Sequence, residues 1–510
     1  MEEIPQKLIK QIRSAALDGS IAKEVAIEAS FTRALPSFSI VGLADEAIKE
    51  ARDRVKSALI LCGYQFPPLK ITVNLSPSDL KKSGTQMDLP IALLIALEKE
   101  DVDFGDIFCF GELGLDGTVR APSALFAICL SLAMQGTLKR VICDAQSAAQ
   151  VARIPQIEVF GVRTLGEAIA FFEKRTEIAP TRSAPFGAGS VTFADQSYYY
   201  EESFSADFSE VRGQAMAKRA ALIAASGFHN LILSGSPGCG KSMIIKRMAG
   251  IMPPMTMREV LLQASLESLE GKTPSFKAER PLRHPHHTAT KASIFGGGSR
   301  ESMMGECALA NRGVLFFDEL PHFPRAILEA LREPLEDHRL LISRVNSKVV
   351  YETRFLFAAA MNPCPCGNLL SKSKPCRCSQ LEISRYQSRL SDPFLDRIDL
   401  FVQMGQSDHG AKRGESSAEM RSCVFEAFKA QRERGQSEFN AKLSDAETER
   451  FCVLDREAQS TLLDAANRFA LSARAVCKLR RVSRTIADLA ASPEVGKAHL
   501  LEALSFRRRQ

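Results

Sequence analysis

One short segment holds the residue types that bind the phosphates of a nucleotide. An apolar run, Leu231 to Ser234, leads into a loop with the spacing G-x-x-x-x-G-K-S and then into a helical stretch. The loop consists of Gly235, Ser236, Pro237, Gly238, Cys239, Gly240, Lys241 and Ser242. Its glycines let backbone N–H groups turn toward phosphate oxygens, and the following helix adds its positive dipole end. Because Lys241 can neutralise phosphate charge and Ser242 can ligate Mg²⁺, the segment predicts a site for ATP and Mg²⁺.

Two acidic residues follow a second apolar strand. The run from Val314 to Phe317 ends at Asp318 and Glu319. Open α/β sheets bind their ligands at the carboxyl ends of strands, which is where these acids fall. Asp318 can hold Mg²⁺ through water, and Glu319 can orient the attacking water in phosphoryl transfer. The other interpretation is an acidic helix cap before Pro321, and the phosphate loop makes the catalytic one preferable.

Two more residues extend the predicted catalytic group. Asn362 follows the strand-like run Phe355 to Ala360, where its amide can touch the γ-phosphate or the attacking water; simple turn formation is the alternative. Arg397 is a candidate arginine finger supplied to a neighbouring subunit. Its alternative is a structural salt bridge with Asp396 or Asp399. A finger that acts between subunits requires a ring.

Four of the thirteen cysteines form a cluster. Two C-x-C pairs are separated by nine residues, and their members are Cys364, Cys366, Cys376 and Cys378. Four thiolates can close a tetrahedral Zn²⁺ site, whereas the other interpretation is a loop of reduced thiols in solvent. The basic neighbours Arg377, Arg385 and Arg389 favour thiolates or a nearby phosphate backbone. The cluster therefore predicts either a zinc-pinned contact loop or a loop of free thiols.

Two other segments bear on nucleic-acid binding. Three histidines lie in the segment Arg283 to Thr288, which we interpret as a pore or interface loop. A metal site is less favoured there because Pro285 interrupts the spacing and no carboxylate partner is evident. The segment Asp337 to Tyr351 predicts a β-hairpin with Arg339 near its start. The hairpin either projects into a central channel or is an ordinary solvated one.

The length, composition and net charge of the chain limit the class of protein to which it can belong. A chain of 510 residues exceeds a single hydrophobic core and indicates several domains. No apolar run approaches the ~20 residues of a membrane span, and the N-terminus lacks the pattern of a secretory signal. We therefore expect a cytoplasmic protein with no membrane partner and with cysteines that are free or bind metal. A net charge of +6 permits a polyanionic partner without requiring one.

Four regions differ in their pattern, and together they predict an α/β protein. Residues 1–175 alternate strand-like and helix-like runs, as an α+β domain does. Residues 176–208 are rich in turn-forming residues and predict a linker. Residues 209–405 have the alternation of a parallel sheet with helices on its faces, which predicts an ATPase core that carries the four-cysteine loop. Residues 406–510 are mostly helical and predict a lid.

These motifs resemble the magnesium-chelatase-like AAA+ ATPase family over nearly the whole chain. The resemblance rests on the phosphate loop and on several further segments: Asn74–Leu80, Asp88–Leu93, Arg283–Thr288, Asp318–Pro321, Met361–Gly367, Leu395–Leu400 and Leu471–Arg474. It implies an AAA+ P-loop core with a C-terminal helical lid. By the same resemblance Arg474 is a second sensor that reaches bound nucleotide from the lid, and relatives share the cysteine pattern.

The N-terminal domain resembles the Lon peptidase fold without its catalytic dyad. A serine–lysine peptidase needs a nucleophilic serine near the start of the predicted helix at Asp88, and none is present. The predicted helix Ala124 to Met134 carries no lysine, and Ser123 is the nearest stray serine. We therefore interpret this domain as a scaffold that helps assembly or grips a substrate.

The family resemblance implies a hexameric, ATP-driven ring motor that acts on branched or single-stranded DNA. Its expected role is branch migration as a helicase or translocase during DNA uptake and recombination in natural transformation. The alternative is a protein-remodelling or metal-insertion ATPase, because the same core resembles the magnesium-chelatase motor subunit. A third possibility is an assembly factor that binds ATP without hydrolysing it. Where relatives more often have Pro, Thr and Thr, this loop has Ser236, Cys239 and Ser242, which keeps the hydroxyl for Mg²⁺.

Overall fold

The computed structural model describes residues 10–43, 45–183, 186–297, 303–343, 348–371, 374–405 and 414–508. The chain forms two compact units. The first contains Met1–Gly187, Leu261–Phe276 and Val345–Val349, and the second contains Ala188–Val260, Lys277–Arg344 and Val350–Gln510. Within the described ranges, no helix is both long and apolar enough to cross a membrane.

The first unit is built on a seven-stranded sheet in the order β3-β4-β2-β1-β5-β8-β9. Its antiparallel pairs are β1 with β2 and β2 with β4, and its other pairs are parallel. The strands are β1 (Lys10–Asp18), β2 (Ile21–Thr32), β3 (Ser37–Val41), β4 (Lys70–Ser76), β5 (Ile107–Cys109), β8 (Arg140–Asp144) and β9 (Glu158–Val162), with the small pair β6 (Glu112–Leu113) and β7 (Val119–Arg120). This mixed sheet confirms the predicted α+β character.

Five helices accompany that sheet: α1 (Glu46–Leu61), α2 (Asp88–Ala96), α3 (Leu125–Met134), α4 (Ala145–Val151) and α5 (Leu165–Phe172). Helix α2 is buried at every position from Asp88 to Ile95, because it contacts α1, α5 and the strands β1 and β2. Its one charged side chain, Asp88, forms an ion pair of 2.7 Å with Arg54 of α1. The pair offsets the cost of burying a carboxylate at the start of an apolar helix.

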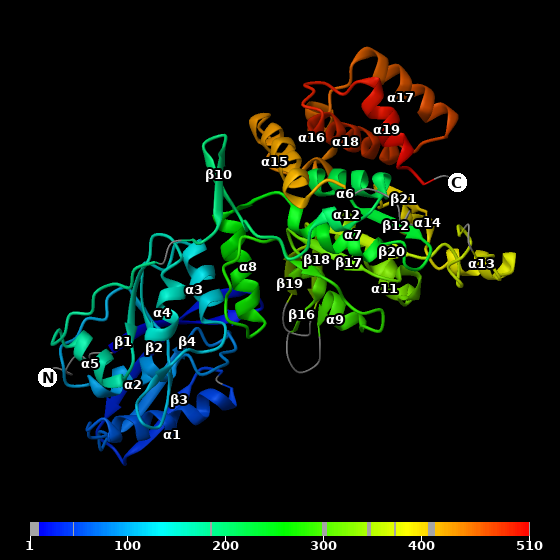
Figure 1. The fold of residues 1–510 in the computed structure, drawn as a ribbon. Helices are drawn as coiled ribbons and strands as arrows, with labels where there is room; N and C mark the ends of the chain where they lie inside the picture. The colour runs from blue at the N-terminus through cyan, green and yellow to red at the C-terminus, as the bar shows by residue number, and fades with distance from the viewer. Residues whose placement is uncertain are drawn as a thin grey trace. The chain divides into compact units, whose positions relative to one another are not determined.

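The second unit contains a five-stranded sheet in the order β14-β17-β20-β12-β21 (Figure 1, green to yellow). Every strand pair in it is parallel. The strands are β12 (Leu231–Gly235), β14 (Leu282–Arg283), β17 (Val314–Phe317), β20 (Leu356–Met361) and β21 (Leu400–Met404). All residues of β12, β17 and β20 are buried, which explains why these segments read as unbroken apolar runs. The predicted parallel sheet is confirmed.

The core helices of this unit follow its strands. They are α6 (Ala215–Gly227), α7 (Lys241–Met248), α9 (Lys291–Phe295), α10 (Glu306–Leu309), α11 (Arg325–Ala330), α12 (Arg332–Glu336), α13 (Gln380–Gln387) and α14 (Asp392–Leu395). Helix α8 (Met257–Leu269) is divided between the two units at Leu261. Both α6 and α7 contact β12, so the helix that follows the phosphate loop is fixed directly to the strand that precedes it.

Asn230, just before β12, connects three strands of this sheet. Its side-chain amide donates to the carbonyl oxygen of Arg397 at 2.8 Å and accepts from the N–H of Phe357 at 3.0 Å. Its backbone N–H donates to Asp399 at 2.8 Å. Asn230 thereby fixes the backbone that carries Arg397 to β12 and β20.

The C-terminal part of the second unit is helical, as predicted (Figure 1, orange to red). It contains α15 (Ser417–Glu433), α16 (Asp445–Phe451), α17 (Arg456–Arg468), α18 (Ala473–Leu489) and α19 (Lys497–Ser505). Side chains of Ser416, Ser444, Asp455 and Ser472 cap the first four helices. Apolar residues of α18 share one core with the sheet, so this region packs on the ATPase core rather than forming a separate body.

The predicted linker, residues 176–208, contains a β-hairpin, and this prediction was incomplete. Strands β10 (Gly189–Phe193) and β11 (Gln196–Tyr200) pair, and β13 (Met255–Thr256) adds a third strand. The Tyr198 ring packs edge-to-face on Phe428 of α15 at 5.0 Å. The sequence did not predict this hairpin, because its strands are short, their apolar residues alternate with polar ones and the segment is rich in turn-forming residues.

The predicted hairpin near Arg339 is present as β18 (Arg339–Ser343) and β19 (Lys348–Glu352), which form a two-stranded sheet. Its tip, residues 344–347, lies outside the described residues. A second small pair consists of β15 (Gly296–Gly297) and β16 (Met303–Met304).

We expect Asn230→Ala to lower the free energy of unfolding by about 2–4 kcal/mol, because it leaves a buried carbonyl and a buried N–H without their partner. Urea unfolding followed by circular dichroism measures the change. Asn467→Ala, on an exposed face of α17, is the control and should match the parent protein. Equal stability of the two variants would contradict the role given to Asn230.

Candidate nucleotide site

The phosphate loop connects the end of β12 to the start of α7. Gly238 and Gly240 have φ values of +79° and +92°, which L side chains rarely adopt. No atom lies within 4 Å of where a Cβ would stand at either position, so the backbone angle rather than space requires glycine there. At Gly235 the reason is space, since a Cβ would lie 2.7 Å from the carbonyl oxygen of Met404. Backbone angle and limited space thus account for three glycines of this loop.

Lys241 is nearly buried at the start of α7. Its Nζ donates to the carbonyl oxygens of Gly235 at 2.7 Å and Ser236 at 3.0 Å, and to Oδ1 of Asn362 at 3.1 Å. Within the described part of the chain, the oxygen acceptors of this ammonium group are all uncharged. A buried cation with neutral acceptors gains strongly from an anionic partner, and a phosphate supplies one.

Ser242 and Asp318 meet directly. The Ser242 hydroxyl donates to Oδ2 of Asp318 at 2.7 Å, and the other carboxylate oxygen accepts the N–H of Glu319 at 3.0 Å. A hydroxyl and a carboxylate at this spacing are oxygen ligands of the kind that Mg²⁺ prefers. The structure therefore brings together Lys241, Ser242, Asp318 and Asn362, which come from the ends of three parallel strands.

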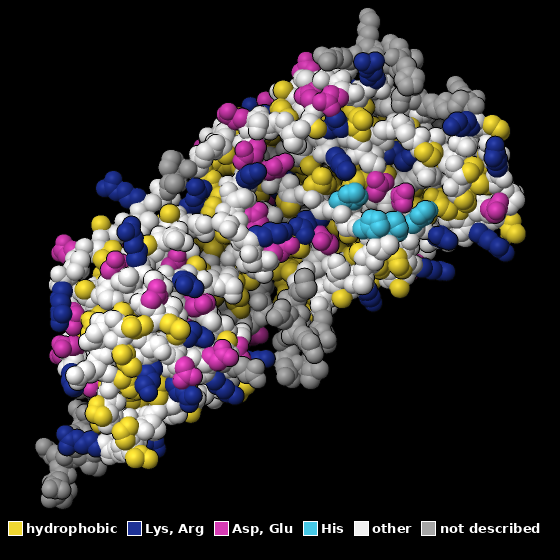
Figure 2. Space-filling model, turned by 60° about the horizontal axis from the view of Figure 1, so that its bottom comes forward, with side chains coloured by type: hydrophobic (Ala, Val, Ile, Leu, Met, Phe, Trp, Pro, Cys, Tyr) yellow, Lys and Arg dark blue, Asp and Glu magenta, His cyan; other side chains and the backbone are white. Residues whose placement is uncertain are grey.

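Glu319 lies between two histidines. Its backbone has φ +53°, and its exposed carboxylate oxygen is 3.7 Å from Nδ1 of His287 and 3.6 Å from Nδ1 of His322. The His287 ring is 4.1 Å from that of His286, and Figure 2 shows histidines (cyan) gathered on one face. The expectation that these histidines have no carboxylate partner is wrong for His287. His322 was missed, although its position three residues after Glu319 is a signal.

His284 belongs to the same segment but has a different environment. Its ring stacks on Phe316 with centroids 4.5 Å apart. Partial burial lowers the pKa of His284, and the positive charge of Lys246 acts in the same direction. The imidazole is therefore held neutral beside β17, where it packs against the strand that ends at Asp318.

Arg397 and Arg474 form a second group, and neither is paired as expected. Both guanidinium groups bind the carboxylate of Glu336: Nη2 of Arg397 donates to Oε2, and Nη1 of Arg474 donates to Oε1 at 2.7 Å. Asp396 and Asp399 are therefore not the salt-bridge partners of Arg397. Asp399 instead lies 3.5 Å from Nζ of Lys478. Burial at Glu336 favours the neutral acid, but the two arginines outweigh it and lower the pKa of Glu336.

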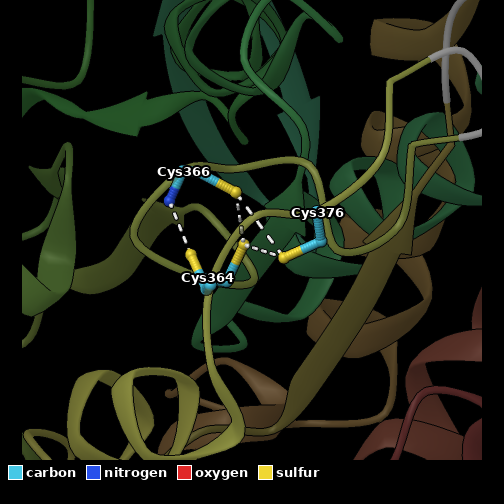
Figure 3. A group of neighbouring side chains, drawn as sticks. Cys364, Cys366 and Cys376 are labelled. Atoms are coloured by element: carbon cyan, nitrogen blue, oxygen red, sulfur yellow. Dashed lines mark hydrogen bonds between the residues drawn. The ribbon is translucent and has the colours of Figure 1, made fainter.

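The four cysteines of the cluster converge on one point. Figure 3 shows the sulfur atoms of Cys364, Cys366 and Cys376 facing one another, and their separations are 3.5–3.7 Å. The sulfur of Cys378 accepts the N–H of Cys366 at 3.4 Å. All four sulfur atoms lie within 4.8 Å of one another, so the set has the compactness of a metal-binding group.

Helix α13 and the residues after it tie this loop to the nucleotide site. The Gln387 side chain donates to the carbonyl oxygen of Pro363 at 3.2 Å, next to Asn362. Arg389 donates to the carbonyl oxygen of Pro321 at 3.1 Å, two residues after Glu319. The cysteine loop is therefore attached to both strand ends that carry predicted catalytic residues.

Comparison with known proteins assigns the chain to a family. Residues 207–412 match the family described as magnesium chelatase, subunit ChlI, residues 27–146 match subunit ChlI of Mg-chelatase, and residues 414–507 match the ChlI C-terminal region. The competence protein ComM of Haemophilus influenzae is 37% identical over 506 residues, which cover 97% of each chain. Proteins named YifB from Salmonella typhimurium and Escherichia coli are each 36% identical over 97% of this chain and 96% of their own.

This chain belongs to the magnesium-chelatase-like AAA+ family of ComM and YifB. Membership implies an ATPase that uses ATP and Mg²⁺, and the geometry fits both ligands. Lys241 has neutral acceptors that a phosphate can replace, and Ser242 and Asp318 present adjacent oxygens. For a magnesium-chelatase-like AAA+ protein, the loop from Gly235 to Ser242 is the expected nucleotide site.

Lys241→Ala should weaken binding of a fluorescent ATP analogue with Mg²⁺ on the order of tenfold to a hundredfold, because it removes a charge-assisted contact to phosphate. Fluorescence anisotropy measures the dissociation constant. Lys246→Ala, an exposed lysine on the same helix, is the matched control and should bind like the parent protein. If both variants bind equally well, Lys241 does not contact the nucleotide.

Proposed function

We propose that this chain is an ATP-driven ring motor that acts on DNA and promotes branch migration during DNA uptake and recombination. The observation that carries the proposal is the division of the predicted catalytic residues into two groups. Lys241 is hydrogen-bonded to Asn362 and Ser242 to Asp318, whereas Arg397 and Arg474 are bonded to Glu336. Arginines that bind Glu336 rather than residues of their own phosphate loop can serve a neighbouring protomer, which is what a ring ATPase requires.

The proposed chemistry is phosphoryl transfer to water. Lys241 and the loop N–H groups hold the β- and γ-phosphates, and Ser242 with Asp318 holds Mg²⁺, which offsets the charge that develops on the phosphate oxygens. Glu319 orients the attacking water, and Asn362 touches that water or the γ-phosphate. Arg397 of the adjoining protomer and Arg474 as second sensor complete the charge compensation.

DNA as the substrate is supported by a relative's name and by the basic segments near the site. ComM of Haemophilus influenzae is called a competence protein, and it is similar along nearly its whole length. In this chain, β18 begins with Arg339 three positions after helix α12 ends, and the cysteine loop carries Arg377 with Arg385 and Arg389 nearby. Basic side chains of this kind bind a phosphate backbone without reading its sequence. We propose that a hexamer lines its channel with the β18–β19 hairpins.

We propose that the four cysteines bind Zn²⁺. A tetrahedral site with Zn–S bonds of about 2.3 Å has sulfur atoms about 3.8 Å apart. The separations of 3.5–3.7 Å between three of these sulfurs fit that geometry. Backbone N–H groups of Arg377 and Asn368 point at the sulfur of Cys366 and lower the pKa of that thiol to about 6. The thiolate, which is the form that binds metal, is thus favoured at Cys366, whereas the pKa values of Cys364 and Cys378 are raised.

For the N-terminal region, residues 1–175, we propose a Lon-peptidase-like scaffold without peptidase activity, joined by residues 176–208 to the core (209–405) and the lid (406–510). Ser123 is exposed before α3. The buried Lys82 donates its Nζ proton to the carbonyl oxygen of Pro77, so this lysine is engaged by backbone rather than by a serine. This arrangement supports a role in assembly or grip.

Two other functions predict different behaviour of one variant. A protein-remodelling or metal-insertion ATPase would hydrolyse ATP without responding to DNA. A binding-only assembly factor would keep its function when Glu319 becomes Gln, whereas a motor stalls with ATP bound. Glu319→Gln therefore separates the binding-only factor from the two ATPases, and the response of the parent protein's hydrolysis to DNA separates the DNA motor from the remodelling ATPase.

The parent protein should resolve a labelled four-way junction in the presence of ATP and Mg²⁺, and Glu319→Gln should bind ATP but fail to resolve it. Gel electrophoresis of the junction gives the measurement. DNA should stimulate hydrolysis, and added salt should weaken this stimulation because phosphate contacts release counterions. Glu449→Gln, exposed on α16, is the control. Hydrolysis by the parent protein that ignores DNA at moderate salt would contradict the DNA motor and favour the remodelling ATPase.

Protein purified from zinc-containing medium should carry one Zn²⁺ per chain, because four convergent thiolates satisfy a tetrahedral ion. Denaturation in the presence of a chromogenic chelator measures the metal released. Cys376→Ser should lower this content, whereas Cys423→Ser, an exposed free cysteine of α15, should not. Equal metal content in the two variants would exclude the cluster as the binding site.

A further inference from the structure

Glu336 joins three parts of the second unit through one carboxylate. It is the last residue of α12, three positions before β18 begins at position 339. Its oxygens accept from Arg397, which follows α14, and from Arg474 in α18 of the lid. A side chain at the base of the hairpin thus links a core arginine to a lid arginine.

The environment of Arg397 shows how strongly it depends on this carboxylate. Its side chain is only 11% exposed, and one of its terminal nitrogens donates to the carbonyl oxygen of Pro393. Its Nε is buried and has no hydrogen-bond partner in the parts of the chain that the structure describes. Glu336 is therefore the acid that balances a mostly buried guanidinium group, and loss of its charge would leave that group uncompensated.

Arg474 adds a second positive charge to the same carboxylate. Two guanidinium groups that share one acid repel each other, and the acid is what holds them at a fixed separation. Each arginine binds a different oxygen of the Glu336 carboxylate, so neither arginine displaces the other. Arg397, Arg474 and Glu336 thus form a unit with one net positive charge. Glu336 fixes the positions of both guanidinium groups.

We propose that Glu336 is a positioning residue that holds Arg397 and Arg474 as one unit for the nucleotide site of a neighbouring protomer, and that ties this unit to the β18–β19 hairpin. The inference rests on the proposed function, because it takes Arg397 as the arginine finger. Movement of the hairpin on its substrate reaches both arginines through α12, so substrate engagement and ATP hydrolysis are coupled at this carboxylate.

The test is Glu336→Gln, which keeps the shape of the side chain but removes its charge. We expect kcat for ATP hydrolysis to fall on the order of tenfold to a hundredfold, because misplacing a charged catalytic group costs this much. The dissociation constant of an ATP analogue should not change, since Lys241, Ser242 and Asp318 are untouched. Glu333→Gln, an exposed acid on the same helix, is the matched control and should hydrolyse ATP like the parent protein.

Two further variants distinguish positioning from folding. Glu336→Asp restores the charge and should raise kcat above that of Glu336→Gln. In a double-mutant cycle with Arg474→Gln, the double variant should be little worse than Arg474→Gln alone, because both changes break the same unit. All variants should remain folded at the assay temperature and form particles of the same size, and thermal melting shows how much the uncompensated Arg397 charge lowers the melting temperature.

The outcomes separate this inference from the proposed function. If the parent protein does not hydrolyse ATP, or hydrolyses it no faster than Lys241→Ala, the proposed function fails. If the parent protein is active and Glu336→Gln matches Glu333→Gln, only the role of Glu336 is overturned. It is also overturned if the loss in Glu336→Gln comes with weaker nucleotide binding or smaller assemblies, or if its effect adds fully to that of Arg474→Gln.

Discussion

The hydrogen bond between Ser242 and Asp318 depends on the parallel sheet, and the nucleotide site depends on that bond. Strands β12 and β17 flank β20, and all three run in the same direction. Their carboxyl ends therefore deliver the phosphate loop, the acids and Asn362 to one edge, where Ser242 and Asp318 meet at 2.7 Å. An antiparallel neighbour at any of these positions would send one of the three groups to the opposite edge.

The two groups of predicted catalytic residues differ in how their positive charges are compensated. Among the residues that the structure describes, the hydrogen-bond acceptors of Lys241 Nζ are neutral groups, so its charge is left for a ligand. Arg397 and Arg474 form ion pairs with Glu336, so their positive charge is already partly compensated within the chain. A phosphate therefore meets little competition at the first group, whereas at the second it competes with a carboxylate. In the proposed mechanism, binding by the first group and catalysis by the second are thus separable steps.

Local patterns predicted the parts of the site that lie at the ends of strands. Strand-like runs and the residues that follow them predicted the phosphate loop, the acids after β17 and Asn362 after β20. This works because open α/β sheets bind their ligands at the carboxyl ends of parallel strands. The partner of Arg397 could not, since Glu336 is 61 positions away and nothing in a single sequence pairs them. The β10–β11 hairpin was missed because its short strands are stabilised by Phe428 of α15, a contact made only in the folded chain.

The cysteine loop gives the clearest case of chemistry that tertiary structure adds to a motif. Its spacing indicated a metal site, but its attachment to Pro363 and Pro321 through Gln387 and Arg389 appears only in the fold. Burial raises the pKa of Tyr386 to about 12, so this phenol remains neutral beside His322, with ring centroids 6.3 Å apart. The two backbone contacts join the segment after the cysteine loop to Pro363, next to Asn362, and to Pro321, two residues after Glu319. No local sequence pattern predicts such contacts, because their partners are 24 and 68 positions apart.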